Sequence, residues 1–178
     1  MGPYERKLSD RFDSFDVDGD GVLTEQDFVG MAQRILGEFG VDRFSPKAHA
    51  LMGGARNYWV GLAGISDLDA DGRISREEFV SAAARRLRDD QAGFDEVIRP
   101  WAEAVVAVAD TDDDGDVSIA EWQRMLVAMG VEAGRARMRA ESTDTDGDGR
   151  ISVPEVVNTA VEFYTTENER LMEFAAAR

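Results

Sequence analysis

Apolar residues recur along the chain at the three- and four-residue spacing that is typical of amphipathic helices. Leu8, Phe12 and Phe15, for example, fall on one face of a predicted helix that ends near residue 16. The same spacing returns on both sides of three further polar stretches, so the sequence predicts paired helices throughout. The later helices are expected to turn these residues inward: Phe28, Met31, Ala32, Ile35, Tyr58, Trp59, Leu62, Phe79, Val80, Ala83, Val97, Trp101, Val105, Val108, Trp122, Met125, Leu126, Met129, Val156, Val157 and Ala160.

Two stretches, Gly37–Ser45 and Arg88–Gly93, are predicted to be connectors. The second divides the chain into an expected N-terminal pair of helix–loop–helix units, residues 1–90, and a C-terminal pair, residues 91–178. The helix expected near Glu132–Ser142 has the weakest apolar face, because Ala133, Ala136 and Met138 offer little to bury.

The four polar stretches share one twelve-residue pattern. They run Asp16–Asp27, Asp67–Glu78, Asp110–Glu121 and Asp144–Glu155. Aspartate stands at positions 1, 3 and 5, glycine at position 6, an apolar residue at position 8 and an acid at position 12. Glycine at position 6 permits a sharp turn in which a Cβ atom would interfere. Position 8 suits a short strand contact, so we expect the first stretch to pair with the second and the third with the fourth.

This pattern supplies the oxygen ligands that calcium prefers. Calcium takes six to eight oxygen atoms, and a twelve-residue loop offers them from positions 1, 3, 5, 7, 9 and 12, position 7 through its backbone carbonyl. One copy is also compatible with a surface turn, but four copies, each with its closing acid, predict up to four calcium sites. The predicted ligands are Asp16, Asp18, Asp20, Val22, Thr24, Asp27, Asp67, Asp69, Asp71, Arg73, Ser75, Glu78, Asp110, Asp112, Asp114, Asp116, Ser118, Glu121, Asp144, Asp146, Asp148, Arg150, Ser152 and Glu155.

Positions 9 and 12 of each loop have a second predicted role. Ser or Thr followed three residues later by an acid is a capping box, which begins a helix. The carboxylate that closes on the metal therefore also stands in the first turn of the helix that leaves the loop. Metal binding is thus expected to influence the orientation of that helix.

The first loop differs because it closes with Asp27, whose side chain is one methylene shorter than that of glutamate. A shorter arm reaches a metal less readily with both oxygens, which favours a lower coordination number. Magnesium prefers six ligands in tight octahedral geometry. We therefore expect the first loop to tolerate Mg²⁺ best or to bind calcium most weakly. The alternative is a full calcium site with a slightly adjusted exit helix.

These loops resemble those of the EF-hand superfamily. The chain length, the long first spacing between loops and a further helical piece expected at Glu167–Ala177 resemble the sarcoplasmic calcium-binding proteins and the bacterial calerythrin group. The resemblance implies an all-α fold, with four EF-hands in two paired lobes that form one compact unit, short β contacts between paired loops and an extra C-terminal helix. It also implies a calcium buffer. Members often have one inactive hand, whereas no loop here lacks its ligand types.

Charge and composition exclude several other classes of function. The chain has 36 acidic and 20 basic residues and a net charge of −16, and 20 of its acidic residues lie within the four loops. Such a charge disfavours nucleic acid and anionic membranes as partners. There is no cysteine, which excludes disulfides and thiolate metal sites. Only two basic residues, Lys7 and Lys47, are lysine, a bias that is typical of a high-GC, bacterial genome.

The N-terminal segment Met1–Asp10 has no apolar run that resembles a signal peptide. No stretch approaches the roughly 18 apolar residues that span a membrane. We therefore expect a cytoplasmic protein and a monomer, while the sequence indicates no protein target.

Calcium loops of this kind occur in three classes of protein: calcium buffers, calcium sensors and enzymes. The seven methionines are spread along the chain, whereas a sensor exposes a Met-rich groove when it binds calcium. The spread of methionines therefore favours a buffer. The alternative is a sensor that exposes an apolar surface to a protein target. His49 is the only histidine, so catalysis would depend on carboxylates already committed to metal. Oxidative photoproteins share the arrangement of hands but resemble sites with several His, Tyr and Trp residues, and we expect no enzyme.

Overall fold

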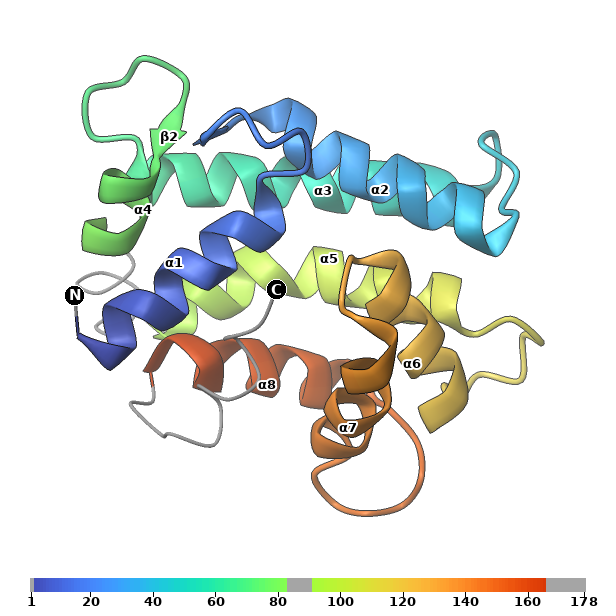
Figure 1. Cartoon of the computed structure of the whole chain (residues 1–178). Coiled ribbons are helices and arrows are strands. Elements are labelled where there is room, and N and C mark those ends of the chain that lie inside the picture. The colour runs from blue at the N-terminus through green and yellow to red at the C-terminus, as the bar shows by residue number, and fades with distance from the viewer. Residues whose placement is uncertain (1, 83–90, 166–178) are drawn as a thin grey trace.

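The computed structural model describes residues 2–82 and 91–165, and this part of the chain is built mainly of helices (Figure 1). The expected all-α fold is therefore confirmed. The elements are α1 (Pro3–Phe15), β1 (Val22–Leu23), α2 (Glu25–Phe39), α3 (Pro46–Ser66), β2 (Ile74–Ser75), α4 (Arg76–Ala82), α5 (Gln91–Ala109), α6 (Ile119–Ala128), α7 (Ala133–Thr143) and α8 (Val153–Thr165).

The four loops meet in two pairs. Strands β1 and β2 are antiparallel, with Leu23 opposite Ile74. In the other half, Ser118 and Arg150 form an antiparallel bridge, and the amide of Ile151 donates to the carbonyl of Val117 at 2.7 Å. The residues at position 8 of all four loops are buried. The expected pairing, first with second and third with fourth, is confirmed.

Aromatic side chains fill the core of the N-terminal half. Phe15, Phe28 and Tyr58 contact one another, with ring centroids 5.2–5.8 Å apart. Phe79 packs edge-on against Phe12 at 5.9 Å. These residues come from four different helices, so the apolar faces that the spacing predicted converge on one core. Of the residues expected to point inward, some are only partly buried (Val80, Val97, Leu126, Met129, Val156 and Ala160), and Ala83 lies outside the described residues.

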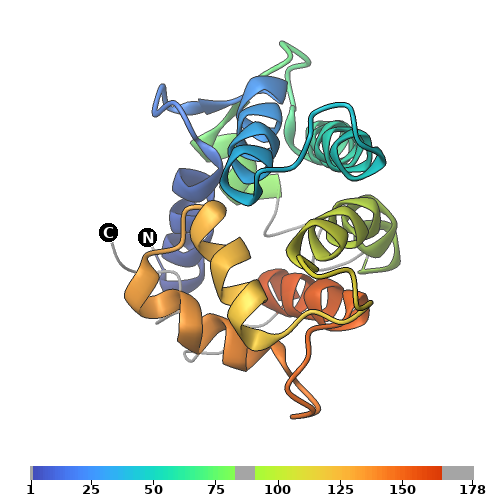
Figure 2. The same cartoon turned by 90° about the vertical axis from the view of Figure 1, so that its right-hand side faces the viewer.

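Helices α3 and α5 join the two halves along their length, as two views show (Figures 1 and 2). Glycines in α3 permit the close approach. A Cβ atom on Gly61 would stand 2.3 Å from a methyl group of Val97, and one on Gly54 would stand 3.0 Å from the carbonyl oxygen of Pro100. The backbone of α3 therefore packs directly against α5 at these glycines, and the two halves form one compact unit.

Contacts between α1 and α8 close the molecule on the other side. The Tyr4 hydroxyl donates to the carbonyl of Tyr164, and the ammonium group of Lys7 lies 4.4 Å from the ring centroid of Phe163. Burial lowers the pKa of Lys7 to about 8, although Glu162 acts in the opposite direction. The first helix of the chain thus packs against the last described one.

The boundaries of some elements differ from those that the sequence predicted. Helix α2 continues to Phe39 and ends at Gly40, which adopts a left-handed conformation (φ 64°), so the predicted connector Gly37–Ser45 is too long. Gly37 lies inside the helix because its amphipathic face extends that far. Likewise α5 begins at Gln91, so the described part of the predicted connector Arg88–Gly93 is helical.

The helix predicted near Glu132–Ser142, which has the weakest apolar face, is confirmed as α7. Two alanines, Ala136 and Ala140, are completely buried, while Met138 is 53% exposed. Small residues let this helix approach its neighbours closely, so its packing does not require large side chains. The predicted piece Glu167–Ala177 lies outside the described residues. Within 2–82 and 91–165, no helix combines the length and apolar character needed to cross a membrane.

The contact between α3 and α5 can be tested with two neighbouring glycines of α3. Gly54→Ala places a Cβ atom against the backbone of α5, so overpacking should lower the free energy of unfolding by about 1–3 kcal/mol. Gly53→Ala is the matched control, because nothing lies within 4 Å of its Cβ position, and alanine favours a helix by about 0.5–1 kcal/mol. Urea unfolding of the calcium-loaded variants measures both. Equal stabilisation by the two substitutions would show that the close approach is wrong.

Candidate metal centres

Hydrogen bonds to the aspartates shape each loop in the same way. In the first loop, Oδ2 of Asp16 accepts from the amide of Gly21 at 3.0 Å, and Oδ1 of Asp20 accepts from the amide of Val22 at 2.9 Å. The equivalent pairs in the other loops measure 3.0–3.1 Å and 2.8–2.9 Å. The amides turn toward the carboxylates and hold them around one point in all four loops.

The closing acid of each loop is held by its two oxygens. In the fourth loop, Oε1 of Glu155 accepts from the amide of Thr145 at 2.8 Å, and Oε2 accepts from the amide and hydroxyl of Ser152 at 2.9 and 2.8 Å. Glu78 and Glu121 are held by the same two loop positions. The hydroxyl of Ser118 in turn accepts from the amide of Glu121. The predicted capping boxes therefore form, and each acid connects its loop to the start of the exit helix.

These hydrogen bonds stabilise the charged form of the closing acids. Burial raises the pKa of Glu121, but hydrogen bonds from Thr111 and Ser118 outweigh it and lower the pKa to about 2. Hydrogen bonds from Ser75 lower the pKa of Glu78. Burial opposes the same effect in Glu155, whose pKa is also lowered. At neutral pH these side chains therefore present negative oxygens.

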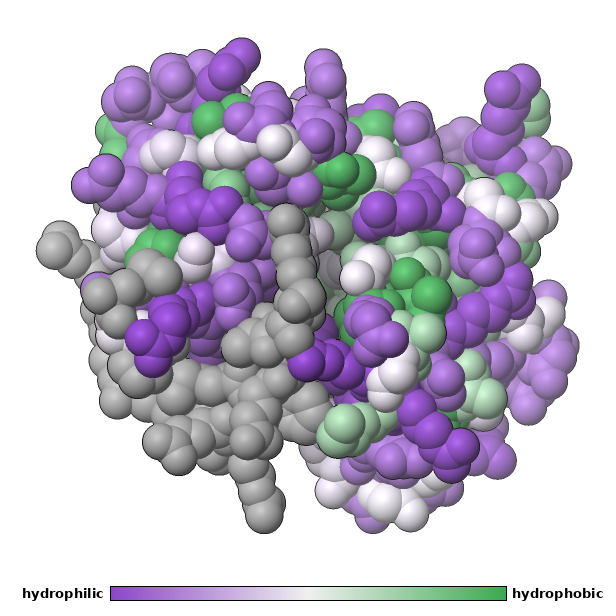
Figure 3. Space-filling view, viewed as in Figure 1, coloured by the Kyte–Doolittle hydropathy of each residue, from purple (hydrophilic) through white to green (hydrophobic). Residues whose placement is uncertain are grey.

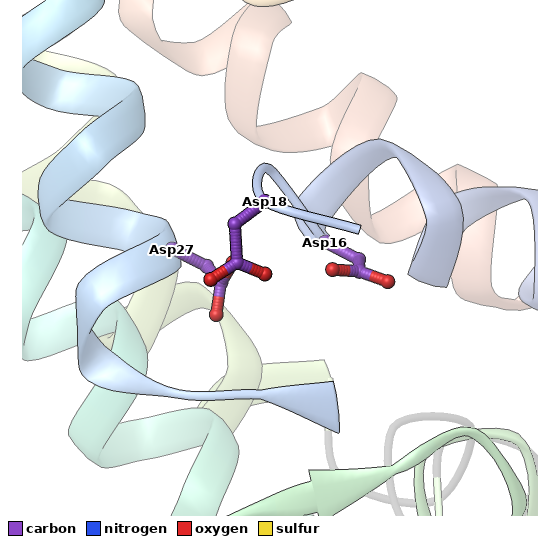
Figure 4. Close-up of side chains that lie close together, drawn as sticks. All are labelled: Asp16, Asp18 and Asp27. Carbon is purple, nitrogen blue, oxygen red and sulfur yellow. The ribbon is translucent and has the colours of Figure 1, made fainter. Parts of the chain in front are cut away.

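In every loop, carboxylate oxygens from three residues gather within 4.8 Å of one another. Figure 4 shows the trio of the first loop, in which Asp18 and Asp27 converge while Asp16 faces them from the opposite side. Hard, anionic oxygen donors of this kind suit Ca²⁺ and Mg²⁺. Glu78 lies outside the trio of the second loop. The four trios are Asp16, Asp18 and Asp27; Asp67, Asp69 and Asp71; Asp110, Asp112 and Glu121; and Asp144, Asp146 and Glu155.

Position 7 carries an ion pair that the sequence did not predict. The side chains of Asp116 and Arg150 stand at this position in the third and fourth loops, and they pair with each other. Position 7 binds metal through its backbone carbonyl, so its side chain is available for such a contact. The pair lies beside the bridge between the two loops. Because both side chains are half exposed, it stabilises the contact by less than about 1 kcal/mol.

Position 4 has a backbone requirement that the sequence also did not reveal. Its residue is left-handed in every loop: φ is 75° at Gly19, 60° at Ala70, 58° at Asp113 and 75° at Gly147. Glycine adopts this conformation freely, and aspartate tolerates it better than alanine does. The glycines at this position in the first and fourth loops were the only sequence feature that pointed to a left-handed residue there. Ala70 is therefore the strained residue of the set.

Family models and relatives match most of this chain. The model of an EF-hand domain pair matches residues 5–84, and the model of a single EF hand matches residues 107–127 and 143–158. A solved structure of a Streptomyces coelicolor calcium-binding protein, studied for prokaryotic calcium-mediated regulation, is 48% identical. It superposes with a TM-score of 0.87 and covers 91% of this chain and 98% of its own.

Two curated relatives are more distant in sequence. Calerythrin from Saccharopolyspora erythraea is 28% identical over 162 residues, which covers 89% of this chain and 90% of calerythrin. The β chain of a sarcoplasmic calcium-binding protein from Penaeus sp. is 28% identical over 114 residues, 61% of this chain and 58% of its own. The resemblance drawn from the loops is confirmed, and the two bacterial sources fit the origin that the arginine bias indicated.

The strain at Ala70 generates a stability prediction. A left-handed conformation costs a residue with a Cβ atom about 1–2 kcal/mol, so Ala70→Gly should raise the free energy of unfolding by about 0.5–1 kcal/mol after the added freedom of the unfolded chain is counted. The matched control is Asp113→Gly, which removes an ion pair with Lys47 at 2.6 Å and should give no gain. Urea unfolding in excess calcium compares them. A gain at both positions, or at neither, would contradict this explanation.

Proposed function

This chain belongs to the EF-hand calcium-binding family, and we propose that it is a cytoplasmic, monomeric calcium buffer in which metal binding drives compaction. The observation that carries the proposal is the fourfold repetition of one complete loop geometry. Each loop has its aspartates held by loop amides and its closing acid held at positions 2 and 9.

All four hands bind metal in this proposal, through the 24 residues that the loop pattern identifies. The shared hydrogen bonds support the same ligand scheme in every loop, and in three of the loops the convergent trio includes the closing acid. A division into residues 1–90 and 91–178 is compatible with the pairing of loops. The packing of α3 against α5 nevertheless means that the two pairs share one core.

The apo protein is expected to be less compact because its carboxylates repel. The four loops place sixteen ligand carboxylates at positions 1, 3, 5 and 12, and four calcium ions neutralise eight of those charges. A metal that binds the folded chain alone stabilises it by mass action, by about 2.7 kcal/mol per site at a hundredfold excess over Kd. Since the closing acids also begin the exit helices, loss of metal should loosen those helices first.

The surface of the described residues favours a buffer over a sensor. Large apolar side chains that are exposed there are scattered over different elements, as single residues commonly are: Val17, Phe44, Val60, Leu68, Val127 and Met138. Met31 and Met125 are buried in the core. A sensor that captures a protein target is the alternative, and the regulatory context of the Streptomyces coelicolor relative supports it.

One titration of the full chain with calcium distinguishes these functions. We expect the hydrodynamic radius to fall and the helical circular dichroism to rise as calcium is added, while the fluorescence of a hydrophobic dye stays level or decreases. A radius and a dichroism signal that both ignore a chelator would contradict metal-coupled compaction. A sharp rise in dye fluorescence on loading would instead establish the sensor. Magnesium alone is the control for the effect of ionic charge.

We also propose that the first loop discriminates least between calcium and magnesium. Asp27 is 4% exposed, and its short side chain accepts hydrogen bonds from Val17 at Oδ1 and from Thr24 at Oδ2. The longer glutamates of the other loops use both oxygens in the same way. With less reach toward the metal, Asp27 favours one ligand oxygen and the six-coordinate geometry that magnesium prefers.

A reciprocal pair of substitutions tests this proposal. Asp27→Glu should raise the preference of the first loop for calcium over magnesium by about tenfold, or about 1.4 kcal/mol. Glu155→Asp is the matched reverse change and should lower that preference in the fourth loop. Calorimetric titrations with each ion, with the amides of Gly21 and Gly149 followed by NMR, separate the two sites. Unchanged affinities after Asp27→Glu would refute the proposal.

A further inference from the structure

A cavity of about 440 Å³ lies between the two halves of the molecule. Its wall includes residues of α1, α2, α3, α5, α6, α7 and α8, so helices of both halves contribute to it. Figure 3 shows a recess near the middle of one face, with apolar residues along its right-hand side. The volume falls within the range of about 300–1,000 Å³ that is typical of small-molecule sites.

Much of the cavity wall is apolar and aromatic. Tyr58, Trp101, Trp122 and Phe163 line it together with aliphatic side chains such as Val105. Such a wall offers an apolar body the contacts that sites for organic ligands commonly provide. Water in this space would find few partners along that part of the wall.

Three arginines line the same cavity from α1 and α7. They are Arg11, Arg135 and Arg139. Burial, together with the positive charges of Arg11 and Arg135, lowers the pKa of Arg139 to about 10. Nε of Arg11 is buried without a hydrogen-bond partner. Its guanidinium lies 4.5 Å from the ring centroid of Phe15 and 5.4 Å from that of Phe163. The cations therefore adjoin the apolar wall.

The carboxylates on the wall have contacts of their own. Asp13 pairs with Arg76, and Asp10 lies near that same arginine and near Arg6. Glu132 accepts a hydrogen bond from the amide of Gly134 at 2.9 Å. Asp16 is the first aspartate of a metal loop. A fourth cation on the wall, Arg34, donates from Nε to the carbonyl of Ala128.

We propose that this cavity binds an organic carboxylate with an apolar body, whose charged end lies among Arg11, Arg135 and Arg139. Guanidinium groups match a carboxylate through two parallel hydrogen bonds, and such charge-assisted bonds are stronger than neutral ones. The apolar part of the ligand then packs against the tryptophans and Tyr58. A small inorganic anion would leave that wall without contacts, which is why the site favours an amphipathic ligand.

The cavity wall continues into the metal loops. Asp16 is the first residue of the first loop, Trp122 follows the closing acid of the third, and Thr143 precedes the fourth. The indole Nε1 of Trp122 donates to the hydroxyl of Thr143 at 3.3 Å. A ligand in the cavity thus contacts residues adjacent to three metal sites. Carboxylate binding and calcium binding are therefore coupled, and the coupling is reciprocal.

Dodecanoate is the probe for this site, with dodecanol as its uncharged counterpart. The full, calcium-loaded chain should bind one dodecanoate at least tenfold more tightly than dodecanol in calorimetric titrations below the micellar range. In a Trp59→Phe variant the only tryptophans that fluoresce are the two of the cavity, and their emission should change in proportion to the dodecanoate bound. Removal of calcium should weaken dodecanoate binding, and dodecanoate should raise calcium affinity by the same factor.

Matched variants locate the charged end. Arg135→Gln and Arg139→Gln should each weaken dodecanoate binding by about tenfold, or about 1.4 kcal/mol, through the loss of one charge-assisted contact, while dodecanol binding stays unchanged. Arg137→Gln is the control on the same helix, because Arg137 is 74% exposed and pairs with Glu141. Ala160→Phe keeps the arginines but fills part of the cavity, and it should weaken both ligands. Circular dichroism with calcium verifies that each variant folds.

Several results would overturn the proposal. No saturable dodecanoate binding by the folded wild-type chain is one, and equal binding of dodecanol is another. Loss of affinity in Arg137→Gln as large as that in Arg139→Gln would place the anion elsewhere. Binding that occurs only after removal of residues 166–178 would identify that segment of the chain as the occupant instead. None of these results bears on calcium binding itself, which the titrations of the preceding section measure.

Discussion

The attraction between clustered carboxylates and a cation is the interaction on which the rest of this structure depends. Each loop brings acids within a few ångströms, a placement that is unfavourable in isolation. Loop amides oppose the repulsion by donating to those acids, as Gly21 does to Asp16, but a divalent ion opposes it far more strongly. Because the closing acid also begins a helix, the same charge balance controls how the helices leave the loops and meet in the core.

That charge balance acts on a core shared by both halves. The glycines of α3 bring it to the backbone of α5, while α1 reaches α8 through Tyr4 and Lys7. An ion that tightens a loop in one half therefore acts on helices packed against the other. This arrangement suits a protein that gains and loses compactness as a whole, and it also surrounds the central cavity with residues that adjoin several loops.

Periodic and local features were readable from the sequence, whereas features that depend on two distant segments were not. The loops, their pairing and the inward faces around Phe12 and Trp122 follow from spacing alone. The left-handed residue at position 4 was missed because Ala70 carries no glycine signal there, and the Asp116–Arg150 pair because its partners lie in different loops. The cavity and its arginines were not predicted, since nothing local shows that α1 and α7 face one interior space.

The two-residue strands between paired loops carry a consequence for the history of such proteins. Leu23 and Ile74 exchange backbone contacts across the pair, so each loop is part of the scaffold of its neighbour. A substitution that abolishes metal binding in one loop leaves the strand contact, and with it the support of the neighbouring loop, in place. Hands are thus free to lose their ions singly, but a loop can be deleted only together with its partner, and chains built this way should evolve by whole pairs.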